Sequence, residues 1–358
     1  TMAFPVAQRW LLGVLVISLG ASALSGSIDP YFLDVVMGVG VSVVLASSLN
    51  LINGFTGQFS LGHAGFMALG AYTSAMLSTV VAPRLGWSPA LLQWVFFPFS
   101  LLVGGLLAAA AGLAVGAPSL RLKGDYLAIV TIAAAEILRF IVSTTGLNDV
   151  TGGPQGLSGF AKEFYDLNPF PVGEYGFWAW TMDEKGLWVR VVAWSLVILG
   201  ALFVAQMIRS PWGRVIKGIR EDEDAVRSLG KNVYSYKMQS LIIGGLLGTL
   251  AGIVFVLPRA VQPGNYGTGL TFFIWTILLL GGASTVLGPI IGSMIFWVLL
   301  SLTEGLLSAG VSSGVITFIQ QDQIGGIRFM LVGLGLMLLV IFRPQGIFGN
   351  KKELYFNA

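Results

Sequence analysis

The chain has 358 residues, of which 55% are hydrophobic and only 10% are charged, and its mean hydropathy is +0.82. Soluble proteins carry about 25% charged residues, so this composition excludes a water-facing surface over most of the chain and indicates an all-α polytopic membrane protein. The net charge of +3 does not indicate a nucleic-acid partner, and the lack of cysteine excludes disulfides and thiolate metal sites.

Ten apolar segments approach the roughly 20 residues that a helix needs to cross the hydrocarbon core. In chain order they are residues 10–26, 31–52, 59–81, 90–117, 125–143, 187–208, 237–258, 270–281, 286–307 and 328–342. The eighth is too short to cross alone and is followed by the glycine-rich run GGASTVLGP, so we expect a re-entrant or broken helix that is buried in protein. The fourth is either one tilted helix or two shorter pieces.

The first apolar segment has an alternative interpretation. Arg9 precedes a short apolar run that ends in small residues, as in a cleaved signal peptide. Because the later spans already direct insertion, and because the first span completes an even number, we expect a span. Thr1 before Met2 is typical of an expression remnant, and residues 353–358 are either native or of similar origin, so neither end enters the functional interpretation.

Lysine and arginine are distributed unequally between the two sides that the alternating spans define. Six lie on one side, Arg139 lies within a span, and thirteen lie on the other side. The thirteen are Arg9, Arg121, Lys123, the seven basic residues of 209–237, Arg343, Lys351 and Lys352. Because cytoplasmic loops carry the excess of Lys and Arg, both termini are predicted to be cytoplasmic.

A glycine-rich region, residues 50–72, joins the second and third spans. Small residues let helices approach closely in lipid, so this region is predicted to form tight helix contacts. His63 is the only histidine, and it is not a metal site because zinc needs three or four ligands. It either forms hydrogen bonds that fix a helix bend, which is the favoured interpretation, or relays protons.

Ionisable residues inside spans are energetically expensive and are therefore functional candidates. Glu136 and Arg139 lie one helical turn apart in the fifth span and can neutralise each other on one helix face. Arg139 is near the outer end and can snorkel, which leaves Glu136 as the deeper candidate. Asp34 and Glu304 also fall within or near spans.

The longest segment on the outer side, residues 144–186, holds six acidic residues against two lysines. Near its start is the run TGGPQGL, residues 151–157. A turn-rich cap over a pathway entrance fits this composition, and so does a solvated loop in which glycine and proline only turn the chain.

Residues 209–237 form the most charged part of the chain, with seven basic and four acidic side chains. The segment contains a Ser-Pro entry, an amphipathic helical stretch, an acidic cluster at residues 221–224 and a stop signal at Gly230. We predict a soluble helix that docks on another protein; a solvated connector is the alternative. The only Gly-Lys pair, at residues 230–231, lacks the upstream glycine of a P-loop, and the sequence contains neither a GxSxG nucleophile elbow nor a HExxH helix, so we expect no catalytic residue, metal or cofactor.

Four blocks of the sequence, residues 49–75, 120–140, 151–157 and 210–237, resemble the M-type permease subunit of bacterial branched-chain amino acid ABC importers. A weaker fifth block is LLLGGASTVLGPIIG, followed later by FRPQGIFG. Together the blocks cover most of the chain in the family's order. Related permeases carry urea, short amides or other amino acids, and TGGPQGL is more similar to the amino acid group.

The resemblance implies one transmembrane permease domain over residues 1–358, with a periplasmic loop at 144–186 and a cytoplasmic coupling loop at 209–237. It implies a multi-pass protein of the bacterial inner membrane that works with a homologous second permease subunit, two cytoplasmic ABC ATPase subunits, a periplasmic substrate-binding protein and an amino acid substrate, with no nucleic acid among its partners. The second permease is either another copy or a different chain.

In such importers a short permease helix enters a groove on the ATPase. Asp224-Ala225-Val226 followed by Gly230 resembles the family's EAA-to-Gly spacing, with Asp for Glu and Val for the second Ala. The implied ATPase-coupling residues are Trp212, Arg214, Arg220, Glu221, Glu223, Asp224, Ala225 and Gly230. The implied translocation-path residues are Gly57, Gln58, Ser60, His63, Glu136, Thr151, Gly152 and Gly153.

Two other classes of protein fit parts of the sequence. An ion-coupled secondary transporter of small polar solutes uses intramembrane charges and broken helices, and Glu136, Arg139, His63 and the run GGASTVLGP are the features in its favour. A purely structural membrane subunit explains the hydrophobicity but not the glycine-rich breaks. The charged docking segment favours the importer, because a gradient-driven carrier does not need one.

Overall fold

Long apolar helices dominate the fold because backbone groups in lipid must find their hydrogen-bond partners within the chain. The computed structural model describes residues 30–120, 125–160, 162–177, 180–314, 316, 320–342 and 346–347. Among these residues, six helices are long and apolar enough to cross a membrane, or seven if one bent pair is counted as a span. The predicted all-α polytopic fold is confirmed.

The long helices follow one another along the chain with few other elements between them. They are α2 (Pro30–Leu49) continued by the π-helix η1 (Asn50–Phe55), α3 (His63–Met76) continued by η2 (Leu77–Val81) and α4 (Ala82–Arg84), α5 (Pro89–Ser119), α9 (Glu184–Arg209), α12 (Val233–Val256) and α14 (Gly288–Ser312). In the bent pair, α6 (Asp125–Val142) meets the short helices η3 (Thr145–Leu147) and α7 (Asn148–Thr151) at 60°. The remaining apolar helices are α13 (Thr268–Gly281) and α15 (Ile324–Phe342).

Each predicted segment from the second to the tenth coincides with one of these helices, whereas residues 10–26 lie outside the described residues. The fourth is a single helix of 31 residues that contains Pro98 and Pro118. The eighth is the short α13, of 14 residues, and the chain leaves it at Gly282 with a φ of 109°. A break in the membrane-spanning backbone therefore lies where the run GGASTVLGP predicted it.

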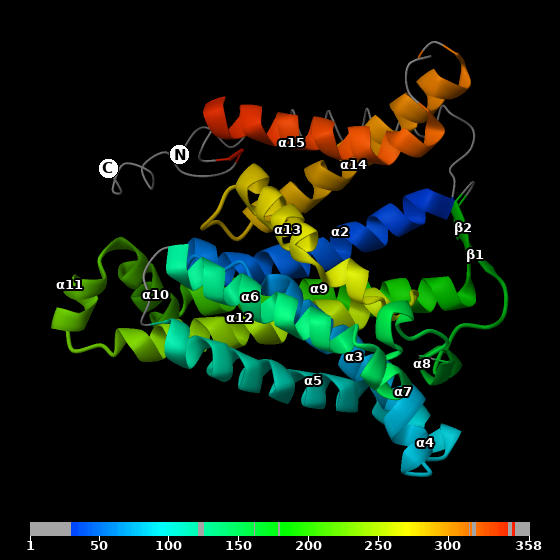
Figure 1. Cartoon of the computed structure of the whole chain (residues 1–358), viewed down its shortest axis with the longest axis horizontal. Coiled ribbons are helices and arrows are strands. Elements are labelled where there is room, and N and C mark those ends of the chain that lie inside the picture. The colour runs from blue at the N-terminus through cyan, green and yellow to red at the C-terminus, as the bar shows by residue number, and fades with distance from the viewer. Residues whose placement is uncertain are drawn as a thin grey trace.

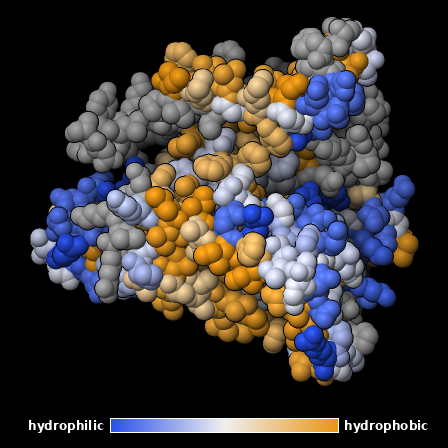
Figure 2. Space-filling view, in the orientation of Figure 1, coloured by the Kyte–Doolittle hydropathy of each residue, from blue (hydrophilic) through white to orange (hydrophobic). Residues whose placement is uncertain are grey.

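Short elements gather at the two ends of the long helices (Figure 1). One end carries α10 (Pro211–Glu221) and α11 (Glu223–Ser228), and the other carries α4, α7, α8 (Lys162–Asp166) and the antiparallel hairpin β1 (Glu174–Phe177) and β2 (Trp180–Asp183). The remaining short helices are η4 (Gly153–Gln155), η5 (Pro263–Tyr266) and η6 (Gln321–Gln323). Figure 2 shows mostly hydrophobic residues over the middle, with one small hydrophilic patch among them, and hydrophilic residues toward both ends. Residues 144–186 and 209–237 thus lie at opposite ends; the hairpin was not predicted.

Helix α12 packs against α2, α3 and α5 and forms the centre of the fold. Glycine makes the closest of these contacts possible. A Cβ atom at Gly252 of α12 would lie 2.1 Å from the carbonyl oxygen of Met67, and one at Gly70 of α3 would lie 2.0 Å from that of Thr249. The two backbones therefore touch directly. In lipid there is no hydrophobic driving force between helices, so such close van der Waals packing at small residues is what holds them together.

We expect Gly252→Ala to destabilise the protein by about 1–3 kcal/mol, because the added methyl group must push α12 away from α3. The measurement is thermal unfolding in detergent. Gly305→Ala is the matched control, since a Cβ atom at Gly305 of α14 meets nothing within 4 Å; alanine is the better helix former, so this variant should be neutral or more stable by up to about 1 kcal/mol. Equal effects of the two substitutions would contradict the proposed close contact.

Candidate coupling surface and translocation path

The Ser-Pro pair starts α10 as predicted. Ser210 is the N-cap, and its side-chain oxygen accepts a hydrogen bond from the backbone N–H of Gly213 at 3.3 Å, while Pro211 occupies the first turn. Gly213 also allows the sharp entry from α9, because a Cβ atom there would lie 2.3 Å from the carbonyl oxygen of Ile208. The helix therefore leaves the end of the membrane-spanning α9 in a defined direction.

Helix α10 has one buried face and one exposed face. Gly213, Ile216 and Ile219, three residues apart, are buried, whereas Arg214 and Glu221 are exposed. Ile219 packs with Val226 of α11 and Val233 of α12 in a small hydrophobic cluster. This cluster joins α10 and α11 to the long helix α12.

The acidic cluster does not act as one patch. Asp222 is the N-cap of α11, and its carboxylate accepts from the backbone N–H groups of Asp224 at 2.9 Å and Ala225 at 3.0 Å. Glu223 accepts from Arg227 at 2.9 Å and from Lys237 of α12 at 2.5 Å. Asp222 and Glu223 therefore stabilise the local fold, since their oxygens bond within the chain.

The eight predicted coupling residues divide into two sets. Trp212, Arg220 and Glu223 are half-buried, and each has a hydrogen bond inside the chain, that of Trp212 running from its indole N–H to Gln239 at 2.8 Å. The exposed set is Arg214, Glu221, Asp224, Ala225 and Gly230. Asp224 also pairs with Arg227 at 2.9 Å but keeps 83% of its side chain exposed. The exposed set lies on the outward side of α10, of α11 and of the turn that follows α11, and we call it the coupling surface.

The first predicted path residues lie against the coupling segment. Gly57 has a φ of 71°, and a Cβ atom there would lie 3.0 Å from the Cγ atom of Arg220. The side-chain amide of Gln58 donates to the carbonyl oxygen of Lys237 at 3.0 Å. Ser60 is buried, and its carbonyl oxygen accepts from the side-chain amide of Asn53 at 3.0 Å. These residues hold the junction before α3 in place.

His63 is fully buried at the first position of α3. Its Nε2 atom lies 2.8 Å from the hydroxyl of Ser48, which donates its single hydrogen to the carbonyl oxygen of Gly244 at 2.5 Å. Because that hydrogen is used, the Nε2 atom must carry a proton and donate to Ser48. The ring thus links α3 to α2 and α12, which supports the bend interpretation; the Nδ1 atom has no hydrogen-bond partner within the described part of the chain.

The predicted Glu136–Arg139 pair is present in α6. Arg139 contacts one carboxylate oxygen through Nε at 2.7 Å and Nη2 at 2.6 Å. The other oxygen accepts from the backbone N–H of Thr268 at 3.1 Å, at the first residue of α13. A carboxylate at a helix N-terminus bonds an unpaired N–H group and interacts favourably with the helix dipole. Glu136 therefore attaches the short helix α13 to α6.

The run TGGPQGL forms a tight turn at the end opposite the coupling surface. Gly152 and Gly153 have φ values of 73° and 54°, and the N–H of Gly153 donates to the hydroxyl of Thr151 at 3.2 Å. Leu157 and Val261 then exchange two backbone hydrogen bonds of 2.9 Å. This turn contacts η5, which precedes α13, and η5 also contacts α6. Thr151, Gly152 and Gly153 thus share one end of the molecule with Glu136.

Aromatic side chains stiffen the loop at the same end. Phe164 stacks on Trp188 with ring centroids 5.6 Å apart, and the indole N–H of Trp188 donates to the carbonyl oxygen of Phe164 at 3.0 Å. Burial and the nearby Asp183 carboxylate raise the pKa of Tyr165, so that its hydroxyl stays protonated and donates to the carbonyl oxygen of Leu257 at 2.7 Å. Residues 144–186 thus include a folded platform rather than only a solvated loop.

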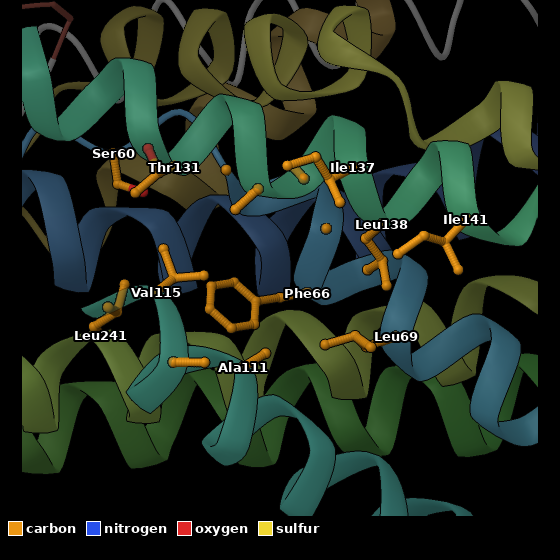
Figure 3. A pocket seen from close by; sticks show the side chains of 15 residues that line it. Ser60, Phe66, Leu69, Ala111, Val115, Thr131, Ile137, Leu138, Ile141 and Leu241 are labelled. Atoms are coloured by element: carbon orange, nitrogen blue, oxygen red, sulfur yellow. The ribbon is translucent and has the colours of Figure 1, made fainter. Parts of the chain in front are cut away.

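An apolar cavity of about 260 Å³ opens between α3, α5 and α6 (Figure 3). Phe66, Ala111, Val115, Ile137 and Leu138 are among its lining residues, and none of the lining residues carries a charge. Transfer of a charged group into apolar surroundings is strongly unfavourable. The cavity therefore fits a hydrocarbon group and not the zwitterionic head of an amino acid, and it does not coincide with the predicted path residues except at Ser60.

Comparison with known proteins finds relatives of this chain by sequence. The family model for the branched-chain amino acid transport system permease component matches residues 31–341. The high-affinity branched-chain amino acid transport system permease protein LivM of Escherichia coli (strain K12) is 30% identical over 318 residues, which are 86% of this chain and 67% of that protein.

More distant relatives also match over most of the chain. The probable branched-chain amino acid transport permease protein LivM of Methanocaldococcus jannaschii is 28% identical over 258 residues, 70% of this chain and 69% of that protein. The nucleoside ABC transporter permease protein NupC of Lactococcus lactis is 20% identical over 267 residues, 69% of this chain and 73% of that protein. No solved structure matches the chain.

We expect Glu136→Ala to lower stability by about 0.5–2 kcal/mol, as loss of an N-terminal helix cap does. Glu136→Gln should lower it less, because the amide oxygen still accepts from the N–H of Thr268. Thermal unfolding in detergent measures both effects, and Glu174→Ala in the exposed hairpin is the control. If the Gln variant unfolds at the same temperature as the Ala variant, the charge of Glu136 contributes more to stability than the hydrogen bond to Thr268.

Proposed function

The chain belongs to the branched-chain amino acid transport system permease family, and on this premise we propose that, as the permease subunit of an ABC importer, it moves branched-chain or related amino acids across the bacterial inner membrane. The observation that carries this proposal is the coupling surface. It is charged, it stands outside the apolar helices, and it is held to α12 by the Ile219, Val226 and Val233 cluster.

The family consists of transport permeases, and the chain works within an ABC transporter complex that has other subunits. We propose that these are a second, homologous permease, two cytoplasmic ATPases and a periplasmic substrate-binding protein. The exposed coupling residues Arg214, Glu221 and Asp224 are available to an ATPase groove. At the opposite end, the folded platform within residues 144–186 is available to the binding protein.

This assignment places the coupling surface in the cytoplasm and the folded platform in the periplasm. The seven basic residues of 209–237 support it, because cytoplasmic segments carry the excess of Lys and Arg. The other basic residues used for this prediction, Arg9, Arg121, Lys123, Arg343, Lys351 and Lys352, lie outside the described residues. With the ten spans predicted from the sequence, an even number, both termini are then cytoplasmic.

The mechanism that we propose is alternating access driven by the ATPases. ATP binding draws the two ATPases together, and the rigid unit of α10 and α11 carries this movement into the long helices. The substrate descends between the two permeases, and the apolar cavity between α3, α5 and α6 suits only the hydrocarbon part of an amino acid. The relative populations of the two states of the alternating-access cycle determine the rate of transport. No covalent bond is made or broken in this subunit.

An ion-coupled carrier is less well supported by the same contacts. The intramembrane charges were the main features in favour of a carrier. However, Glu136 accepts from the first residue of α13, and Arg139 pairs with Glu136. Glu304 likewise bonds to Arg328, and His63 bonds to Ser48. Structural roles account for these groups, whereas a carrier does not explain the coupling surface.

Co-purification and reconstitution test the proposed function. The chain, co-expressed with the candidate ATPases and second permease, should bring down the ATPases, and a loaded binding protein should stimulate ATP hydrolysis and uptake of radiolabelled leucine into proteoliposomes. Uptake by the chain alone, in response to a pH or sodium gradient, would instead identify a carrier.

We expect Gly230→Pro to uncouple transport from ATP hydrolysis. Proline fixes φ near −65°, whereas Gly230 has a φ of 75° and its N–H donates to the carbonyl oxygen of Arg227 at 3.0 Å. Because couplings between sites typically amount to about 5–150-fold, leucine uptake should fall about tenfold while membrane insertion stays normal.

Gly86→Pro is the matched control, since Gly86 also has a positive φ, of 65°, but lies between α4 and α5 at the opposite end. Its uptake should stay within about twofold of the native complex. Equal uptake by the Gly230→Pro and native complexes would contradict the coupling role.

A further inference from the structure

Ser284 has an unusual backbone conformation at the break between α13 and α14. Its φ is 65°, and it is the one non-glycine residue with a positive φ in the described part of the chain. Residues with a Cβ atom rarely adopt this conformation, and they keep it where surrounding contacts hold it. The contacts of Ser284 therefore indicate what this break is built to do.

Asn50 and Gly54 of the π-helix η1 hold the break. The side-chain oxygen of Asn50 accepts from the N–H of Ser284 at 2.9 Å, and its side-chain amide donates to the carbonyl oxygen of Thr285 at 2.8 Å. The hydroxyl of Ser284 donates to the carbonyl oxygen of Gly54 at 3.1 Å. Asn50 is only 1% exposed, so its bonds do not exchange with water. The irregular end of α2 and the break before α14 are thus clamped together.

Helix α10 reaches the same point from the coupling surface. The guanidinium group of Arg220 donates to the hydroxyl oxygen of Ser284, which can accept because its hydrogen points to Gly54. The side chain of Arg220 lies against Gly57, and a Cβ atom at this position would lie 3.0 Å from the Cγ atom of Arg220. Lys217, one turn earlier, lies 5.5 Å above the ring of Phe55. One face of α10 therefore contacts η1 and the break simultaneously.

We propose that Asn50, Gly54, Arg220 and Ser284 form a transmission joint, in which Asn50 and Ser284 are positioning residues for transport. The proposal rests on the proposed function and adds to it the route of the movement. The continuous helix formed by α2 and η1 ends at Phe55, and the backbone between α13 and α14 is irregular, so these are the two places where we expect these helices to move. The joint fastens both to α10, so that one displacement of the coupling surface moves both pairs of helices together.

Connected hydrogen bonds between rigid elements are a physical basis for such transmission. Each member of the joint has a definite part in it. Asn50 bonds to backbone groups on both sides of the Ser284–Thr285 peptide, and the Ser284 hydroxyl bonds to α10 on one side and to η1 on the other. The positive φ of Ser284 aims its side chain at both partners.

Ser284→Gly is the cleanest test, because glycine adopts a positive φ readily and only the hydroxyl contacts are lost. The assembled complex in proteoliposomes should hydrolyse ATP at the native rate but take up about fivefold less leucine per ATP hydrolysed, at the low end of typical couplings between sites. Ser143→Gly is the matched control: its hydroxyl donates only to Phe140 within α6, far from the coupling surface, and its uptake per ATP should stay native.

A double-substitution cycle with Arg220→Ala separates transmission from simple loss of structure. If the two side chains act through one contact, Ser284→Gly should reduce uptake per ATP less than about twofold in the Arg220→Ala background. Independent, multiplying losses would overturn the joint. Asn50→Leu gives a second measurement, with loss of uptake per ATP expected in a complex that still contains both ATPases.

The outcomes also distinguish this proposal from the proposed function. Failure of the native chain to bind ATPases would refute the importer itself. Native uptake per ATP in both Ser284→Gly and Asn50→Leu complexes would refute only the joint. Parallel losses of ATP hydrolysis and uptake, with unchanged uptake per ATP, would assign these residues a merely structural role and would likewise overturn the proposal.

Discussion

Backbone that leaves the helix inside an apolar protein must find hydrogen-bond partners in another segment, and this constraint organises the molecule. In the irregular segment between η1 and α3 the N–H of Leu61 donates to Thr131 of α6, and in the first turn of α3 the N–H of Ala64 donates to Thr271 of α13. Where it is irregular between α13 and α14, Asn50 supplies both a donor and an acceptor. Where such groups are buried from water, each unmade bond would be costly. The polar side chains buried in the fold therefore fix how its interrupted helices are arranged.

The same constraint explains why the two ends of the protein differ. At the coupling end, helices restart through side-chain caps at Ser210, Asp222 and Asn232, which keep α10 and α11 compact and leave charged groups facing outward. At the opposite end, glycine turns and aromatic contacts build a folded platform beside α13. Between the two ends, glycine residues of α12 such as Gly252 allow this helix to pack closely against α3. Each end thus offers a preformed surface.

Much of the fold followed from local features of the sequence. Apolar runs of about 20 residues predicted the spans because helix length must match membrane thickness. A Ser-Pro entry, an amphipathic stretch and a glycine stop predicted the helical coupling segment because helix starts and stops depend on local interactions. The Glu136–Arg139 pair was predictable for the same reason, since residues three apart share a helix face. The run GGASTVLGP likewise located the break after α13.

Contacts between distant segments were decided only by the tertiary structure. Asn50 and Ser284 are 234 positions apart, and Glu136 and Thr268 are 132 apart; nothing near either residue in the sequence selects its partner. The acidic cluster contained no signal that Asp222 and Glu223 bond inward while Asp224 faces outward. Composition and periodicity report the preferences of one segment for lipid, water or a helical conformation. Which segments meet depends on close packing and on satisfying every buried polar group at once, and that is a property of the whole fold.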